Sequence, residues 1–316
     1  MRTILIGYGE MMRALALGIL KSNHSIAGVL LNDSIGRNAV GSFVSNCIKP
    51  SEDYLFAKAH KLNIINAKSA NSKEFQKAVK NLKADIVITG SWSEKLSIQT
   101  LNILPNAFVN VHPSLLPKYR GPNPYIQNIL NAEKQTGVTF HLMDVNYDTG
   151  AVLYQKKVPV LNNDTGGSLK LRCCAAAQSG IVFLLDNFPE LVKNQTSQIE
   201  SESSYQPQIS LKETIIEFKK ESAADIDKRI RALAPWLKCY IPFKNEFFSF
   251  DNYKIIKELT AANPGTIIRK SSNSVYVACL GGGVMKFSEL KIKRPFSKYL
   301  SKFYWDKLIK ENTALD

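Results

Sequence analysis

The chain has 316 residues, of which 45% are hydrophobic and 22% are charged. This length and composition exclude a chain too small or too polar to bury a core, and they predict a globular protein of two domains. The formal net charge is +14, which favours a polyanionic partner but also fits a lysine-rich, solvated surface.

The sequence carries no leader or membrane signal that we recognise. Glu10 and Arg13 interrupt the apolar N-terminus, and no small-residue cleavage site follows them. No apolar run approaches the roughly 20 residues of a membrane span, so we expect no membrane partner. Five cysteines without CxxC spacing indicate neither a disulfide framework nor a zinc site. These features predict a protein of the reducing cytoplasm, with no metal.

The chain opens with the pattern of a βαβ unit: a strand over Thr3–Gly7, a helix over Gly9–Lys21 and a strand over Ser25–Leu31. The start Gly-Tyr-Gly resembles a dinucleotide fingerprint, and Asp33 lies near the expected acidic position. Met12 occupies the place of the third glycine. A nicotinamide-dependent enzyme is therefore an alternative on this segment alone.

Alternating elements follow a Gly/Ser/Asn-rich loop over residues 32–50. The pattern predicts a helix over 51–62, a short strand at Ile64-Ile65, a helix over 72–82 and a buried strand over 85–89. Such alternation indicates a mostly parallel, Rossmann-like α/β sheet covered on both faces. Ligands of such sheets bind beyond the carboxyl ends of the strands, where Ser91, Trp92 and His112 fall.

The chemistry concentrates in two stretches, FVNVHPSLLPKYRG (108–121) and MDVNYDTG (143–150). Asn110 interrupts a short buried strand, and His112 follows where the strand ends. An amide donor beside a titratable imidazole suits a reaction in which a carbonyl becomes an oxyanion and a proton moves. Asp148, in a turn-like segment, could orient the imidazole or accept a proton. Each residue alone is more often structural.

The combination resembles the folate-dependent formyltransferase family, most closely its methionyl-tRNA branch and also its nucleotide-sugar branch. The resemblance rests on Asn110-x-His112, Ser114-Leu115-Leu116-Pro117, Arg120-Gly121, Thr136-Gly137-Val138-Thr139, Met143-Asp144 and Asp148-Thr149-Gly150. It implies that Asn110, His112 and Asp148 are catalytic and that 10-formyltetrahydrofolate donates the formyl group. The family's folate site maps onto Ile88, Ser91, Trp92, Leu115, Leu116, Pro117, Met143 and Asp144.

The composition shifts at residues 194–210, which are polar and Ser/Gln-rich, so we predict domains at 1–193 and 211–316 with this linker between them. The earlier part should add a helix over 122–130, strands over 138–143 and 151–158, and a long helix over 166–185. Beyond Cys239, six short strands separated by turns predict a small antiparallel, OB-like barrel, which agrees with the resemblance.

The resemblance implies a primary amine as the acceptor, and two classes of acceptor remain open. Basic and aromatic residues interleave over 286–310, which suits contact with tRNA. A nucleotide-linked amino sugar is the alternative, because loop 32–50 carries few basic residues. We predict acceptor contacts from Arg37, Lys291, Lys293, Arg294 and Lys298. A basic RNA-binding module without activity is a third reading, and the complete Asn110, His112 and Asp148 set argues against it.

Overall fold

The computed structural model describes residues 1–31, 50–243, 246–292 and 313–315. Two compact units divide the chain. The first comprises residues 1–128, 133–161 and 168–207, and the second comprises 129–132, 162–167 and 208–316. Residues 194–207 of the predicted linker thus group with the first unit. The predicted domain limits, 1–193 and 211–316, stay a prediction.

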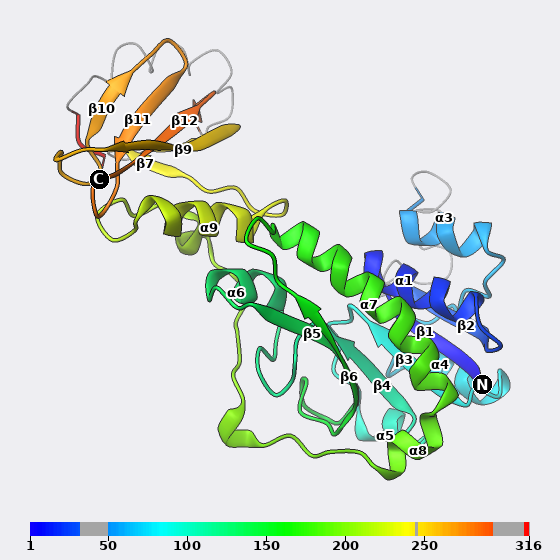
Figure 1. Ribbon diagram of the computed structural model, residues 1–316. Helices are drawn as coiled ribbons and strands as arrows, with labels where there is room; N and C mark the ends of the chain where they lie inside the picture. Colours follow the sequence, from blue (N-terminus) through cyan, green and yellow to red (C-terminus); the bar gives the residue numbers. More distant parts are fainter. Residues whose placement is uncertain (32–49, 244–245, 293–312, 316) are drawn as a thin grey trace. The chain divides into compact units, whose positions relative to one another are not determined.

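A six-stranded sheet forms the centre of the first unit (Figure 1). Its strands lie in the order β2-β1-β3-β4-β5-β6, in which β1 to β4 run parallel and β5 and β6 add an antiparallel edge. The strands are β1 (Arg2–Gly7), β2 (Ser25–Leu31), β3 (Ile86–Gly90), β4 (Phe108–His112), β5 (Gln135–Leu142) and β6 (Val152–Pro159). The mostly parallel α/β sheet predicted from the alternating pattern is confirmed.

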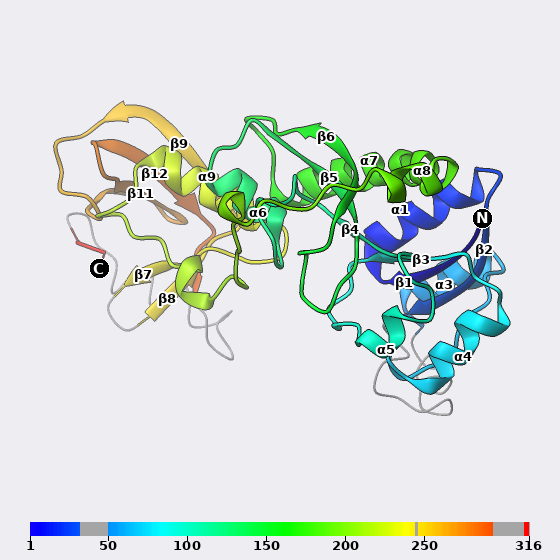
Figure 2. The same cartoon turned by 90° about the horizontal axis from the view of Figure 1, so that it is seen from below.

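Helices cover both faces of this sheet; Figure 2 shows α4 and α5 on one face and α1 and α7 on the other. The helices are α1 (Gly9–Leu20), α3 (Glu52–Ala59), α4 (Lys73–Asn81), α5 (Ile98–Leu101), α6 (Pro124–Leu130), α7 (Gly166–Asp186) and α8 (Phe188–Lys193). Three begin at a serine, Ser51, Ser72 or Ser97, whose side chain accepts a backbone N–H three residues later. Such caps satisfy otherwise unpaired donors of the first turn.

The central strands are buried on both sides, which explains their continuous apolar runs. Ile4 and Ile6 pack with Phe75 and Val79 of α4 in one hydrophobic cluster. One expected strand is wrong: Ile64 makes only an isolated bridge with Val29. A two-residue apolar run is too short to show by sequence whether it continues a ladder or only touches the neighbouring strand.

Helix α7 is long and apolar enough, by length and hydropathy, to cross a membrane, and it is the one described helix that meets this test. Its buried side chains include Leu169, Cys173 and Ala177. Gly180 lies close to the ring of Phe140 in β5. The helix therefore packs on the sheet as the core helix of a globular unit would.

The second unit is the antiparallel β domain that the turn-separated strands predicted. Its described strands form a four-stranded sheet, β10-β11-β12-β9, and a three-stranded sheet, β13-β8-β7. They are preceded by the short 3-10 turn at Leu211–Thr214 and by α9 (Ala223–Leu233). The strands are β7 (Ile241–Phe243), β8 (Glu246–Ser249), β9 (Asn252–Leu259), β10 (Ile267–Lys270), β11 (Ser274–Ala278), β12 (Gly283–Ser288) and β13 (Lys291–Ile292).

Candidate active site

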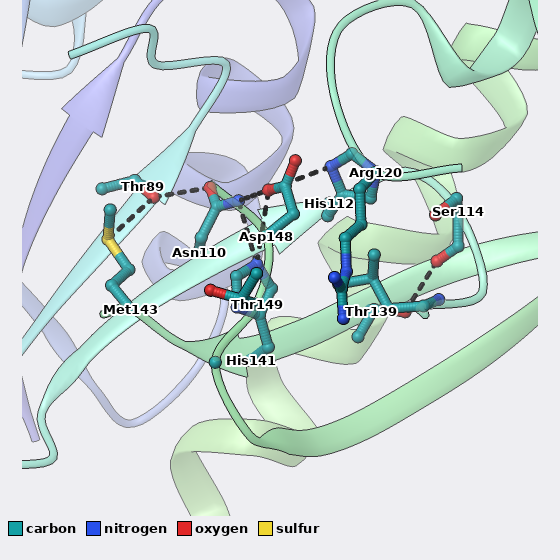
Figure 3. A network of polar contacts seen from close by, with 12 residues as sticks. Thr89, Asn110, His112, Ser114, Arg120, Thr139, His141, Met143, Asp148 and Thr149 are labelled. Carbon is teal, nitrogen blue, oxygen red and sulfur yellow. Dashed lines mark hydrogen bonds and ion pairs between the residues drawn. The ribbon is translucent and has the colours of Figure 1, made fainter. Parts of the chain in front are cut away.

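Three neighbouring strands place three polar side chains in one row. The register pairs Thr89 of β3 with Asn110 of β4, and Asn110 with His141 of β5. Thr89 and His141 are buried, and Figure 3 shows both beside Asn110. Buried polar groups are costly unless they are hydrogen-bonded, so each of them must find a partner in this row or beside it.

The Asn110 amide is fully bonded, and its orientation follows from its partners. The Thr89 hydroxyl donates to Asn110 Oδ1 over 2.7 Å. Asn110 Nδ2 donates to Asp148 Oδ1 over 3.2 Å and to His141 Nε2 over 3.1 Å. Because an ionised carboxylate can only accept, the amide nitrogen has to face Asp148. Asn110 therefore directs its two N–H groups at Asp148 and His141.

Several contacts keep the side chain of Asp148 in its ionised form. Its Oδ2 accepts the backbone N–H of Gly121 over 2.9 Å, and its Oδ1 lies 3.4 Å from His112 Nδ1. Burial raises the pKa of Asp148, but electrostatic attraction to the imidazoles of His112 and His141 in the acidic range where this carboxyl would titrate, together with the Gly121 N–H, outweighs it, so the net pKa lies below its usual range. We conclude that Asp148 is ionised at neutral pH.

His112, at the end of β4, is almost completely buried, with 5% of its surface exposed. Its Nε2 lies 2.8 Å from the carbonyl oxygen of Tyr119. A carbonyl only accepts, so Nε2 carries a proton and Nδ1 is the nitrogen that faces Asp148. Burial lowers the His112 pKa, and the Asp148 charge and the Tyr119 carbonyl oppose this only in part. In the free protein the imidazole is thus neutral, with an unprotonated Nδ1.

The connection after His112 is fixed by internal hydrogen bonds. The Thr139 hydroxyl donates to the Ser114 carbonyl over 2.6 Å and accepts the Leu116 N–H over 3.1 Å. The Ser114 hydroxyl donates to the Lys118 carbonyl over 2.7 Å. This network places the Tyr119 carbonyl where it can bind His112.

The loop that carries Asp148 is shaped by Asp144 and Gly150. The Thr149 hydroxyl and the Asn146 N–H both donate to the Asp144 carboxylate. Asp148 itself adopts a left-handed backbone with φ of 58°, a conformation that aspartate tolerates better than most residues. A Cβ atom at Gly150 would lie 1.8 Å from the Leu142 carbonyl oxygen, so only glycine fits there.

The predicted folate-contacting residues lie in or next to these elements. Ile88 is fully buried within β3, and Leu116 is also buried. The Met143 sulfur lies 3.6 Å from the Thr89 hydroxyl. Leu115, Pro117 and Ser91 are partly exposed. Their assignment to folate binding stays a prediction, and Asp144 has the loop-shaping contacts described above.

Trp92 provides one local test of that assignment. Its ring packs partly against the core cluster, and its indole Nε1 is buried without a hydrogen-bond partner in the described chain. Buried donors are rarely left unpaired. A ligand with a carbonyl or ring nitrogen at this position would satisfy it, which fits a pteridine.

The dinucleotide alternative finds no support at the first βα turn. The Gly9 N–H at the start of α1 donates to Asp53 Oδ2 over 2.8 Å, and Arg13 pairs with the same carboxylate at 2.6 Å. A pyrophosphate would need the helix N-terminus that this side chain already occupies. Two negative groups cannot share it without strong repulsion.

Most predicted acceptor contacts, namely Arg37, Lys293, Arg294 and Lys298, lie outside the described residues. Lys291 is exposed and forms an ion pair with Asp251. Its charge is therefore partly compensated within the domain.

A basic row crosses the four-stranded sheet of the second unit, and the sequence did not indicate it. The register aligns Arg269, Tyr276, Lys286 and Lys254 on four adjacent strands. The Arg269 guanidinium lies 4.3 Å from the centre of the Tyr276 ring, and Lys286 Nζ lies 5.6 Å from it. Lys254 and Lys286 are directly opposite each other, an arrangement that costs stability between like charges.

Two contributors near the candidate active site were also missed: His141, and Gln198 of the predicted linker. A polar residue within an apolar strand was the only available signal for His141. Gln198 Nε2 donates to the carbonyls of Asp148 and Gly150, both over 2.8 Å. Nothing in a Ser/Gln-rich composition distinguishes this glutamine from its neighbours.

Among the described residues, no group of three or more His, Cys, Asp or Glu could hold a metal ion.

The mostly parallel sheet defines an α/β fold, and its buried polar cluster is a candidate active site near the ends of β3 and β4. Residues 2–185 match the family described as Formyl transferase, and residues 208–299 match its Formyl transferase, C-terminal domain. The chain therefore belongs to the formyl transferase family, as the motif resemblance predicted, and it is a formyltransferase.

Curated relatives include two proteins named methionyl-tRNA formyltransferase. The one from Enterococcus faecalis is 29% identical over 74% of this chain and 75% of its own length. The one from Clostridium novyi is 32% identical over 70% of this chain and 72% of its own. The similarity thus extends over most of both proteins.

Solved structures share the fold at lower identity. HypX from Aquifex aeolicus in complex with tetrahydrofolic acid has a TM-score of 0.63 at 16% identity and covers 98% of this chain. This chain spans about half of the HypX chain, 48%. WlaRD, a sugar 3N-formyl transferase in the presence of dTDP and 5-N-formyl-THF, has a TM-score of 0.62 at 20% identity and covers 91% of this chain and 97% of its own.

Proposed function

We propose that this protein transfers the formyl group of 10-formyltetrahydrofolate to a primary amine and that Asn110, His112 and Asp148 carry the reaction. The observation that supports this most directly is their convergence: residues up to 38 positions apart meet at Asp148, which accepts a hydrogen bond from Asn110 and lies 3.4 Å from His112 Nδ1. The folate donor is supported by two similar structures, one in complex with tetrahydrofolic acid and one in the presence of 5-N-formyl-THF.

The first step joins the acceptor nitrogen to the formyl carbon. The neutral amine attacks, the carbonyl electrons move to oxygen, and a tetrahedral oxyanion forms. Hydrogen-bond donors aimed at that oxygen stabilise it; each is worth roughly 3–4 kcal/mol in comparable sites. Asn110 Nδ2 is the donor we assign to this role.

Asn110 is already bonded in the free protein, so its release has to be coupled to proton transfer. Both of its N–H groups point at acceptors, Asp148 and His141. The proton leaving the attacking nitrogen moves to Nδ1 of His112, beside Asp148. Once the positive imidazolium offsets the charge of Asp148, the carboxylate becomes a weaker acceptor, and the Asn110 N–H can turn to the oxyanion.

The second step reverses the proton movement. The imidazolium of His112 donates its proton to the folate nitrogen as the bond between that nitrogen and the formyl carbon breaks. Tetrahydrofolate and the formylated amine leave, and His112 returns to its neutral form. The reaction starts from the neutral imidazole because burial lowers the His112 pKa.

The titration of His112 can be measured directly. We expect its imidazole to titrate below the ordinary histidine value, because burial disfavours the charged form. Asp148→Asn should lower this pKa further, since it removes the charge that favours the imidazolium. The measurement is an NMR pH titration of the His112 ring protons, assigned with His112→Ala. A His112 pKa above the ordinary value, or one unchanged by Asp148→Asn, would contradict the assigned roles.

For the acceptor we favour the methionyl amine of initiator Met-tRNA. Two relatives that match most of this chain are named methionyl-tRNA formyltransferase. The net charge of +14 and the basic row over Arg269, Tyr276, Lys286 and Lys254 suit a polyanion. A nucleotide-linked amino sugar is the alternative, supported by the sugar formyltransferase fold and by the weakly basic loop 32–50.

One experiment separates these acceptors. Purified protein is given 10-formyltetrahydrofolate with Met-tRNA or with a panel of nucleotide amino sugars, and formylated product is measured. We expect product with Met-tRNA at low salt, where electrostatic attraction is greatest. Product with a sugar alone would transfer the assignment to the small-molecule class, and product with neither would overturn the proposed function.

A further inference from the structure

Residues 196–206, which we call the bracing segment, contact the loop that carries Asp148 and the loop of Tyr119 and Arg120 that follows His112. At one end, Thr196 and Val152 exchange backbone hydrogen bonds at 2.8 and 2.9 Å. At the other end, the Arg120 N–H donates to the Ser204 carbonyl over 2.8 Å, and the Gln206 N–H donates to the Arg120 carbonyl over 2.9 Å. The segment is therefore fixed to the first unit on both sides of Gln198.

Gln198 is the partly buried residue in an exposed stretch over residues 193–200. Its amide reaches the Asp148 and Gly150 carbonyls through Nε2, and it accepts two bonds from Arg120, from Nε over 3.1 Å and from Nη2 over 3.0 Å. The nitrogen of a primary amide has two N–H donors, and its oxygen has two acceptor sites. All four are used in Gln198. Glutamate would lack the donors and lysine the acceptors.

Arg120 holds this amide from a buried position. Its side chain is 7% exposed, and its Nη1 pairs with the Glu200 carboxylate at 2.9 Å. A buried guanidinium needs its donors satisfied, and its rigid fork matches the glutamine oxygen and the carboxylate in different directions. Arg120 also follows Tyr119, whose carbonyl binds His112. Arg120 is thus linked to Asp148 through Gln198 and to His112 through Tyr119.

We propose that Gln198 and Arg120 are positioning residues that set the separation between the Asp148 carboxylate and the His112 imidazole. This inference rests on the proposed function for its effect on catalysis. Gln198 fixes the left-handed backbone at Asp148, Arg120 fixes Gln198, and the bonds of Ser204 and Gln206 fix the loop that orients His112. A displacement of about 1 Å in such a set can cost roughly 100-fold in rate.

The test uses Gln198→Met, which keeps the length of the side chain and its neutrality but removes its hydrogen bonds. We expect kcat to fall about 10–100-fold, as is typical when a group that orients a ligating or catalytic residue is lost, with little change in the KM of the folate donor. Gln195→Met is the matched control, because Gln195 is an exposed glutamine outside the bracing segment and only three residues from Gln198. It should retain wild-type kcat.

A second readout separates positioning from mere stability. Asp148 raises the His112 pKa, whereas burial and His141 lower it. If Asp148 moves away in Gln198→Met, the His112 pKa should fall relative to wild type in an NMR titration. This titration needs no substrate, so it decides the inference even if no acceptor amine is formylated. Loss of melting temperature without a shift in this titration would overturn the proposal.

Arg120→Lys provides the second variant in case Gln198→Met does not fold. Lysine keeps the positive charge near Glu200 but cannot hold the Gln198 oxygen with two donors. We expect the same direction of change in kcat and in the His112 titration. An unchanged titration in this variant would likewise overturn the inference.

Discussion

His112→Ala and Asp148→Asn should each lower turnover by about 10²–10⁴-fold, the usual contribution of a positioned acid or base. His112→Ala removes the imidazole that takes the proton of the amine. Asp148→Asn keeps the shape of the side chain but removes the charge opposite His112 Nδ1, 3.4 Å away. Folate affinity should change little, because neither side chain is among the predicted pteridine contacts.

The double variant makes this prediction sharper. Residues that act as one unit give strongly non-additive losses, so His112→Ala combined with Asp148→Asn should be about as slow as the slower single variant. His60→Ala removes an exposed imidazole and serves as the control. Steady-state kinetics and thermal melting on the same preparations separate lost chemistry from lost folding. Near-normal turnover in both single variants would remove them from the mechanism.

Charge reversal in the basic row should affect a tRNA acceptor strongly and a sugar nucleotide hardly at all. Three phosphate contacts with the row would raise the KM for Met-tRNA by roughly 40-fold between 50 and 200 mM salt, because each contact releases a counterion. Lys254→Glu should raise the KM for Met-tRNA at low salt and should make this KM less dependent on salt. A nucleotide sugar carries only a diphosphate, so its KM should respond weakly to both changes.

We expect Lys254→Glu to stabilise the fold although it weakens binding of tRNA. Lys254 lies directly across from Lys286 in the register of β9 and β12. Lys254→Glu converts a like-charge pair into an opposite-charge pair, which favours folding by a few tenths of a kcal/mol to about 1 kcal/mol. Lys212→Glu, an equal change of net charge elsewhere in the unit, is the control. If Lys254→Glu leaves both the KM for Met-tRNA and its salt slope unchanged, the row does not contact tRNA.

Local patterns in the sequence predicted the helices and strands, and they indicated the catalytic set that we propose. Both faces of the parallel strands are buried, so these strands are continuous apolar runs. A run such as residues 85–89 therefore predicts a buried strand. Asn110, His112 and Asp148 could be found because they belong to ordered motifs with turn residues around them. The antiparallel β domain of the second unit followed from short strands between Gly- and Asn-containing turns.

Only the tertiary structure decided which side chains meet. The rows of Thr89 with Asn110 and His141, and of Lys254 with Lys286, depend on strand register, which no single strand contains. The contact of Gln198 with Asp148 depends on where an aperiodic segment crosses the sheet, and its composition is that of any solvated loop. The neutral state of His112 follows from burial, because desolvation of a charge depends on all the atoms around it and not on its neighbours in sequence.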